Sequence, residues 1–223
     1  MQKFDTPAPV AAVLDIPAGL VRLVAAERGD TVVEVLPKDA SKGRDVKAAE
    51  QITVEYTGGV LRIQAPAAKN RVLGNSGQVA VTVHLPAGSR VEAKAALAEL
   101  HSEGRLGEVA FDAAQATVDL EETAGARLTL QAGDIRLARL TGPAHLTTRS
   151  GDLTITEATG GTLTLRTEHG DITVGAARGV SATLDAGTAY GRIHNTLHNT
   201  DGAAAGLAIT ATTSYGNITA RSV

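Results

Sequence analysis

The chain has 223 residues, a formal charge of −3 and 43% hydrophobic residues, which is enough apolar material for a core. It contains no cysteine, so disulfides, thiolate metal sites and cysteine nucleophiles are excluded. The near-neutral charge provides no general attraction to nucleic acid, and the 24 glycines favour many tight turns between short strands.

Residues 1–90 predict an N-terminal β-sheet region built from hairpins. Leu20–Ala25 and Thr31–Leu36 flank a Gly-Asp turn, and Ile52–Tyr56 and Val60–Gln64 flank a Gly-Gly turn. Two strand-like segments on either side of such a turn are typical of a β-hairpin. We expect this region to cover one end of the repeats that follow, because uncovered strand edges pair with other chains.

The remaining N-terminal segments predict one more strand and two irregular stretches. Gln78–Leu85 alternates as a strand does. Pro37–Gln51 and Ala67–Gly77 are rich in charged and small residues and predict loops or short irregular helix. The first holds a basic cluster, diluted by aspartates, that we interpret as a solvated loop and not a nucleic-acid site: Lys38, Lys42, Arg44 and Lys47.

Residues 91–223 contain an imperfect repeat marked by a glycine turn. Successive turn glycines lie 18, 19, 21 and 25 residues apart. The turns are Gly133-Asp134-Ile135, Gly151-Asp152-Leu153, Gly170-Asp171-Ile172, Gly191-Arg192-Ile193 and Gly216-Asn217-Ile218. Apolar and polar residues alternate on both sides of each turn, which indicates two half-buried strands per unit.

This period predicts an all-β fold, a right-handed β-solenoid-like stack of coils of about 18 residues that continues the region 1–90 as one elongated domain. A βαβ unit needs about 30 residues and is excluded by the spacing. The alternative is an antiparallel meander with a hairpin turn at each Gly-Asp. The similarity of successive units favours the solenoid, in which equivalent residues stack on one another.

These features resemble the bacterial putative-adhesin family of β-strand-repeat proteins, also called the toastrack domain. The likeness rests on the early hairpins, the strand ending His84-Leu85-Pro86-Ala87-Gly88-Ser89, and the Ser-Gly-Asp-Leu and His-Gly-Asp-Ile turns, and it covers nearly the whole chain. The resemblance implies a β-repeat fold and carries no catalytic residue with it.

Stacking the units in register places the residues after each glycine in one column: Asp134, Asp152, Asp171, Arg192 and Asn217. Three carboxylates in consecutive coils are able to gather a cation, but Asp beside Gly also forms tight turns through side-chain-to-backbone hydrogen bonds. We favour the turn interpretation. The same register predicts an ion pair between Asp171 and Arg192 on neighbouring coils.

The residues before each glycine form a second column that gains rings toward the C-terminus: Ser150, His169, Tyr190 and Tyr215. Aromatic residues are enriched at interface centres, so His169, Tyr190 and Tyr215 are the candidate interaction surface. The alternative is that the rings pack a corner of the coil. His194, His198 and Asp201 lie close in sequence, but we interpret them as loop residues and not metal ligands, within an insertion over Asn195–Gly206.

The sequence therefore favours a non-enzymatic scaffold or protein-interaction module without catalytic, cofactor or metal residues. We expect a protein partner or self-association. If no other element covers the last coil, which ends at Arg221-Ser222-Val223, its backbone edge is the expected docking edge. The alternative is a polysaccharide-binding or polysaccharide-acting β-helix with a cation site. No apolar run suggests a signal peptide or membrane span, so a cytoplasmic location is expected.

Overall fold

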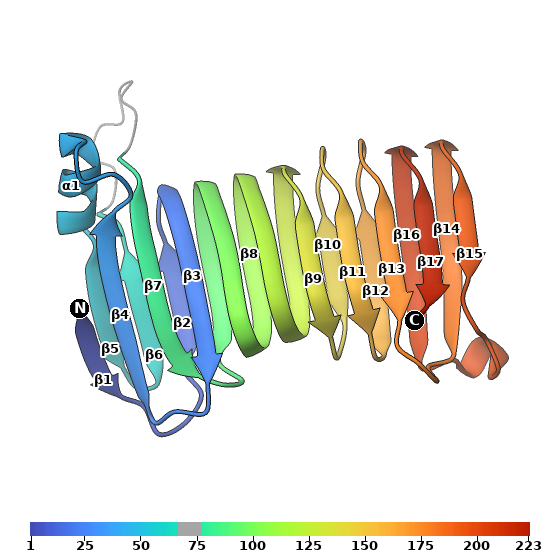
Figure 1. Ribbon diagram of the computed structural model, residues 1–223, viewed down its shortest axis with the longest axis horizontal. Coiled ribbons are helices and arrows are strands. Elements are labelled where there is room, and N and C mark those ends of the chain that lie inside the picture. The colour runs from blue at the N-terminus through green and yellow to red at the C-terminus, as the bar shows by residue number, and fades with distance from the viewer. Residues whose placement is uncertain (67–76) are drawn as a thin grey trace.

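The fold is an elongated stack of β-strands (Figure 1). The computed structural model describes residues 1–66 and 77–223. The strands form two ladders that face each other, and the chain passes from one ladder to the other at its corners. Every strand pairing described within residues 90–223 is parallel, which confirms the solenoid-like stack and rules out the meander.

One ladder begins with an antiparallel pair and then continues in parallel. Its strands, in spatial order, are β5 (Thr53–Thr57), β6 (Val60–Gln64), β2 (Ala11–Asp15), parts of β8 (Arg90–Ala132), β10 (Ala144–Thr147), β12 (Gly161–Arg166), β16 (Leu207–Tyr215) and β14 (Ala182–Tyr190). The long strand β8 winds through successive coils and contributes to both ladders.

The other ladder begins with two antiparallel pairings, β1 (Gln2–Asp5) with β4 (Asp30–Pro37) and β4 with β7 (Val79–Pro86), and then continues in parallel. Its strands, in spatial order, are β1, β4, β7, β3 (Ala18–Ala26), parts of β8, β9 (Ile135–Leu140), β11 (Leu153–Ala158), β13 (Ile172–Ala176), β17 (Ile218–Ser222) and β15 (Ile193–Thr196). Thus β2 and β3 from the N-terminal region pair in parallel with β8 and are coils of the same stack.

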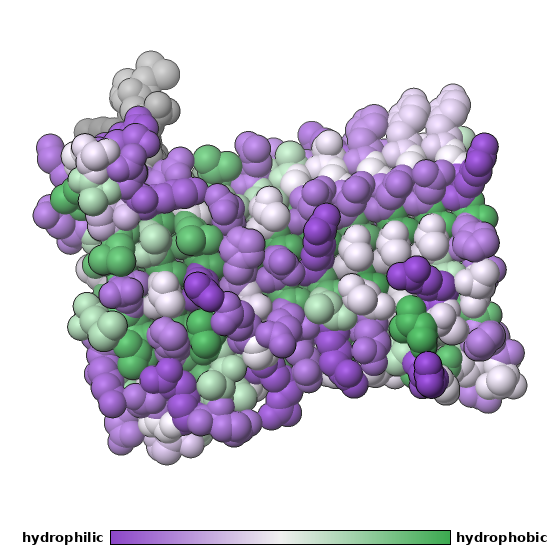
Figure 2. Space-filling model, viewed as in Figure 1, coloured by the Kyte–Doolittle hydropathy of each residue, from purple (hydrophilic) through white to green (hydrophobic). Residues whose placement is uncertain are grey.

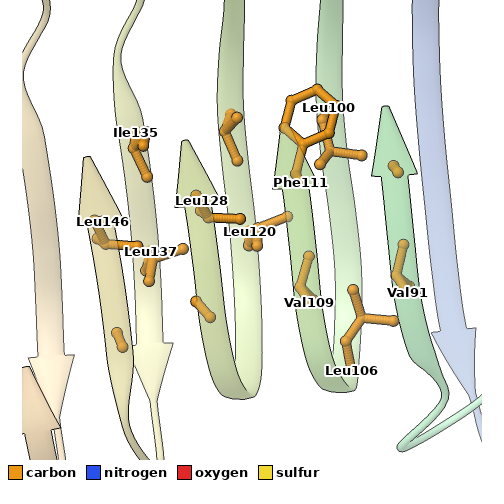
Figure 3. Close-up of a cluster of buried hydrophobic side chains, with 14 of the residues drawn as sticks. Val91, Leu100, Leu106, Val109, Phe111, Leu120, Leu128, Ile135, Leu137 and Leu146 are labelled. Atoms are coloured by element: carbon orange, nitrogen blue, oxygen red, sulfur yellow. The ribbon is translucent and has the colours of Figure 1, made fainter. Parts of the chain in front are cut away.

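Columns of identical or similar apolar side chains fill the space between the ladders (Figure 3). Leu128, Leu146 and Leu165 occupy equivalent positions in three consecutive coils and are at most 1% exposed. Full burial of one such side chain stabilises the fold by about 1.5–3 kcal/mol. Outward residues form matching rows along the surface, and many of these rows are polar (Figure 2). The two-residue alternation seen in the sequence therefore sorts residues between core and solvent.

The N-terminal end of the stack is closed by antiparallel strands and ring packing. Strand β1 pairs with β4, β5 pairs with β6, and the rings of Phe4 and Tyr56 meet with centroids 5.5 Å apart. Asp30 is hydrogen bonded by Arg28 Nε and lies 3.0 Å from Lys3 Nζ, and these cations lower the pKa of its carboxyl group to about 2. A short strand with ion pairs is a common way to block a sheet edge.

The predicted hairpin between Leu20–Ala25 and Thr31–Leu36 is wrong, although both segments are strands. Strand β7 lies between β3 and β4, parallel to the first and antiparallel to the second. The hairpin of β5 and β6 is confirmed, with Gly58 and Gly59 at φ +59° and +81° in its turn. Strands β1 and β2 were not predicted, since both are short and lack a turn motif between them.

The segment Pro37–Gln51 contains the helix α1 (Gly43–Glu50), which packs against β4 and β7. The basic residues around it lie beside carboxylates: Lys38 Nζ is 2.9 Å from Glu99 Oε1, and Lys42 Nζ is 2.9 Å from Asp39 Oδ2. Ala67–Gly77 falls, except for Gly77, outside the described residues. No helix in the described part of the chain is long and apolar enough to cross a membrane.

The last coils are not stacked in sequence order. Strands β16 and β17 insert between the coil of β12 and β13 and the coil of β14 and β15. In Figure 1 the reddest strands accordingly lie inside the stack, and β14 and β15 lie at its end. The prediction that the coil ending at Arg221-Ser222-Val223 presents the free edge is therefore wrong.

Candidate functional site

Each C-terminal coil turns at a Thr-x-x-Gly corner that is tied to the adjacent coil. The threonine hydroxyl donates to the carbonyl of the corresponding glycine one coil away, at 3.0–3.3 Å. The pairs are Thr148 to Gly133, Thr167 to Gly151, Thr213 to Gly170 and Thr188 to Gly216. Thr148, Thr167 and Thr213 are at most 6% exposed. Their hydroxyl groups are therefore buried, and these hydrogen bonds provide them with partners.

The corner glycines are required by close approach of the neighbouring backbone. Gly170 has φ +151°, and a Cβ placed on it would lie 2.0 Å from the carbonyl oxygen of Gly151. That distance is far inside van der Waals contact, so no side chain fits. The glycine therefore sets where each coil turns, and the residues on either side of it project from a fixed backbone.

The column after the glycines is a ladder of side-chain acceptors for backbone N–H groups. Each Oδ1 accepts from the main-chain N–H of the equivalent residue one coil further along, at 2.7–3.0 Å. The sequence of acceptor and donor runs from Asp134 to Asp152, Asp171, Asn217 and Arg192. These side-chain-to-backbone contacts are the turn chemistry that Asp beside Gly predicts.

The acceptor ladder ends at Arg192, which has no oxygen to offer to a further coil. The predicted ion pair between Asp171 and Arg192 is wrong, because the coil carrying Asn217 lies between them. Within residues 1–66 and 77–223, no group of three or more His, Cys, Asp or Glu side chains is placed to hold a metal ion. His194 lies on β15, and His198 follows in the loop, where its N–H donates to Ser222 Oγ.

The column before the glycines projects into solvent as a stack of rings. The His169 and Tyr215 centroids are 5.0 Å apart with an interplanar angle of 11°, and those of Tyr215 and Tyr190 are 4.9 Å apart with 5°. Tyr215 is 51% exposed and Tyr190 68%. We call His169, Tyr215 and Tyr190 the ring column; all three predicted residues come together, and they do not pack a buried corner.

The order within the ring column differs from the order in sequence. Tyr215 lies between His169 and Tyr190, because β16 is inserted beside β12. Tyr215 is covered on both faces by neighbouring rings, whereas His169 and Tyr190, at the two ends of the column, each stack on a ring through one face only. Sequence spacing alone could not show this order, since it depends on which coil the last segment joins.

The free end of the stack, which the sequence did not locate, adjoins the ring column. Strands β14 and β15 pair on one side only, with β16 and β17, among the described residues. Ile193 occupies the column of Ile172 and Ile218, which are 0% and 1% exposed, yet it is itself 46% exposed. The C-terminal end of the core is thus partly open. The arrangement provides an apolar edge, free backbone groups and an aromatic surface side by side.

Comparison with known proteins agrees with this architecture. The sequence profile of the family described as Toastrack DUF4097 matches residues 16–221. A solved "putative adhesin" from Bacteroides fragilis is 14% identical, with 98% of this chain and 95% of that chain covered and a TM-score of 0.58. A "putative adhesin" from Parabacteroides distasonis is 14% identical, with 100% and 95% covered and a TM-score of 0.49. No curated protein matches this chain.

Proposed function

This chain belongs to the Toastrack DUF4097 family, and we propose that it is a non-enzymatic scaffold that binds a protein partner through the ring column. The observation that carries the proposal is the exposure of three stacked rings at one corner of a rigid coil. The adhesin name of the similar Bacteroides fragilis structure supports a binding role over a catalytic one.

The geometry of the ring column suits protein contact. Tyrosine offers a large apolar surface with a polar tip, and its two side-chain torsions limit the entropy lost on binding. Stacking on a neighbouring ring orients each side chain, and Tyr215 lies between two rings, which reduces that loss further. Sugar recognition would instead need a free tyrosine ring face, and of the two tyrosines in this column only Tyr190 has a face that no ring covers. A protein groove that takes the row of ring edges is therefore the better fit.

The test is site-specific photocrosslinking in native lysate. A photoreactive phenylalanine analogue at Tyr215 should capture a discrete protein, whereas the same analogue at Thr129, exposed on β8 and away from the ring column, should not. Direct binding of the captured protein is then measured with purified Tyr190→Ala and Tyr215→Phe variants. We expect affinity to fall at least about tenfold for the first and to be retained for the second.

Two results would overturn the proposal. One is an identical capture profile from both labelled positions. The other is unchanged affinity for Tyr190→Ala when its circular dichroism spectrum equals that of the wild type, since truncating an aromatic hot-spot contact typically costs more than about 1 kcal/mol. Because the side chain of Tyr190 is mostly exposed, its truncation should not affect folding.

A further inference from the structure

We propose that the free end of the stack is a twofold dimer interface in which β14 pairs antiparallel with β14 of a second copy. The proposal rests on the role as an interaction module and adds a second copy of the chain as a partner at a separate edge. The occupied edge is that of β14 and β15. It adjoins the ring column at Tyr190, the last residue of β14, but contacts the second copy through backbone groups and core side chains.

The first argument is the contrast between the two ends of the stack. The N-terminal end is blocked by short antiparallel strands with ion pairs at Asp30. At the other end β14 is nine residues long, and Asp185 is its single charged residue. The Ala182 N–H at the start of β14 donates to His198 O, and beyond that point the edge is long and uncharged apart from Asp185. Edges of this kind present a row of N–H and C=O groups that pairs readily with another strand. An antiparallel partner satisfies these groups in regularly spaced pairs.

The second argument is that the core is only partly capped at this edge. Leu197 packs against the core, and His198 O accepts from the Ala182 N–H at the start of β14, but the cover does not extend along the strand. Leu184 and Ala186 are only partly buried, although the residues paired with them on β16, Ile209 and Ala211, are 2% and 0% exposed. Ile193 on β15 is likewise 46% exposed. Apolar residues are visible at the C-terminal end of the stack in Figure 2. A second copy docked end to end would cover these side chains with equivalent ones.

Charge complementarity selects the twofold arrangement. Arg192 follows the C-terminal end of β14, and its N–H is fixed by Asn217 Oδ1 at 3.0 Å. Asp201 lies beside the N-terminal end of β14, where its N–H donates to Ser181 Oγ at 3.1 Å. Both side chains are exposed, and η1 (Gly202–Ala204), next to Asp201, marks the lower end of β14 in Figure 1, opposite the end that leads to Arg192.

An antiparallel twofold pairing brings opposite ends of the two β14 strands together. Arg192 of each copy then faces Asp201 of the other, which forms two symmetric ion pairs at the rim of the interface. A parallel pairing would instead place Arg192 opposite Arg192. A single surface that carries both charges at its two ends is self-complementary, which is the property a closed dimer needs and an open filament does not.

The experiment is sedimentation equilibrium of the full chain over about 1 to 200 µM. The wild type should show a monomer–dimer equilibrium, and Asp201→Arg should raise its dissociation constant at least about tenfold by placing like charges opposite each other. The double variant Arg192→Asp with Asp201→Arg should restore dimerisation. Arg62→Asp, an exposed charge change on β6 near the other end of the stack, is the matched control and should have no effect.

Hydrogen exchange locates the interface. Amides of β14 should gain protection at dimer-forming concentration, and those of β5 should not. A strictly monomeric wild type, concentration-dependent filaments, or a charge swap that fails to restore the dimer would each overturn the inference. The ring-column proposal is tested separately, because Asp201→Arg should leave crosslinking from Tyr215 intact, while Tyr215→Ala should leave the dimer intact.

Discussion

The acceptor ladder gives a direct test of what the Gly-Asp turns contribute. Asp152 Oδ1 accepts from the Asp171 N–H at 2.8 Å, and the contact is exposed. Asp152→Ala removes the acceptor, while Asp152→Asn keeps it. The chain contains this replacement already: Asn217 occupies the equivalent position and binds the Arg192 N–H at 3.0 Å. The two variants therefore separate hydrogen bonding from charge at a single site.

We expect Asp152→Ala to destabilise the protein by about 1–2 kcal/mol. Hydrogen bonds to charged groups contribute about 1.5–3 kcal/mol, and loss of a side-chain cap costs about 0.5–2 kcal/mol. The freed N–H is near solvent and can bond to water, so the lower part of the range applies. With a urea dependence of about 3 kcal/mol/M for a chain of this size, the unfolding midpoint should fall by about 0.3–0.7 M.

Asp152→Asn should change stability by less than about 0.5 kcal/mol, because it removes one of three stacked negative charges while keeping the acceptor. Hydrogen exchange at the Asp171 amide should accelerate in the Ala variant alone. Equal destabilisation by both substitutions would refute the turn interpretation. A midpoint raised by calcium in the wild type but not in Asp152→Asn would show instead that the column binds a cation.

Three further predictions concern glycine, core and acid. Gly170→Ala should destabilise the protein by more than about 3 kcal/mol in urea melts, because its Cβ would meet a carbonyl oxygen at 2.0 Å. Gly206→Ala, whose Cβ would have no atom within 4 Å, should change the stability by less than about 0.5 kcal/mol. Ile172→Ala should cost about 3 kcal/mol and Ile193→Ala less than about 1 kcal/mol in dilute protein, since the native side chains are 0% and 46% exposed. The ionised Asp30 contributes stability in full above the ordinary carboxyl pKa of 3.8, and this contribution is lost as the pH falls towards its folded-state pKa of about 2. The β1 amides should therefore lose protection from hydrogen exchange in that pH window. Asp30→Asn should remove this pH dependence.

Local chemistry explains why most strands were predictable. The alternation around each Gly-Asp turn identified β9, β11 and β13 directly, because Leu, Ile or Val faces the core at the first and third positions of each strand. The turn glycines were equally clear, since Gly133, Gly151 and Gly170 each precede an aspartate, a pair typical of tight turns. Both patterns lie within about ten residues of sequence, so they can be recognised without knowing which strand is the partner.

Pairing between distant segments was less predictable. The turn Gly29-Asp30 suggested a hairpin, but β7 lies between the two flanking strands. Nothing local distinguishes a Gly-Asp turn that closes a hairpin from one that leads the chain across the fold. Exposure of Tyr190 was undetermined for a related reason: the corner glycine resets the alternation, so parity does not say which side a residue faces.

The order of the last two coils was also missed, yet the sequence contains a physical reason for it. An interior coil of this ladder must offer a side-chain oxygen to the next coil, and Asp171 and Asn217 both do so. Arg192 cannot, so placing its coil inside would leave the Asn217 N–H without its side-chain acceptor. Asn195 adds a second reason, because it stands in line with Val174 and Ala220, which are 1% exposed.

The same two residues make the terminal coil suited to a surface. A polar Asn in an inward position lowers the folding stability little only where water reaches it. A cation at the end of an acceptor ladder likewise lowers it little only where no further coil follows. Insertion of β16 and β17 therefore leaves the coil of β14 and β15, which carries Arg192 and Asn195, as the outermost coil. It also places Tyr190 at the end of the ring column. The free edge and the exposed rings thus follow from one choice of stacking order, which the Arg192 and Asn195 side chains favour.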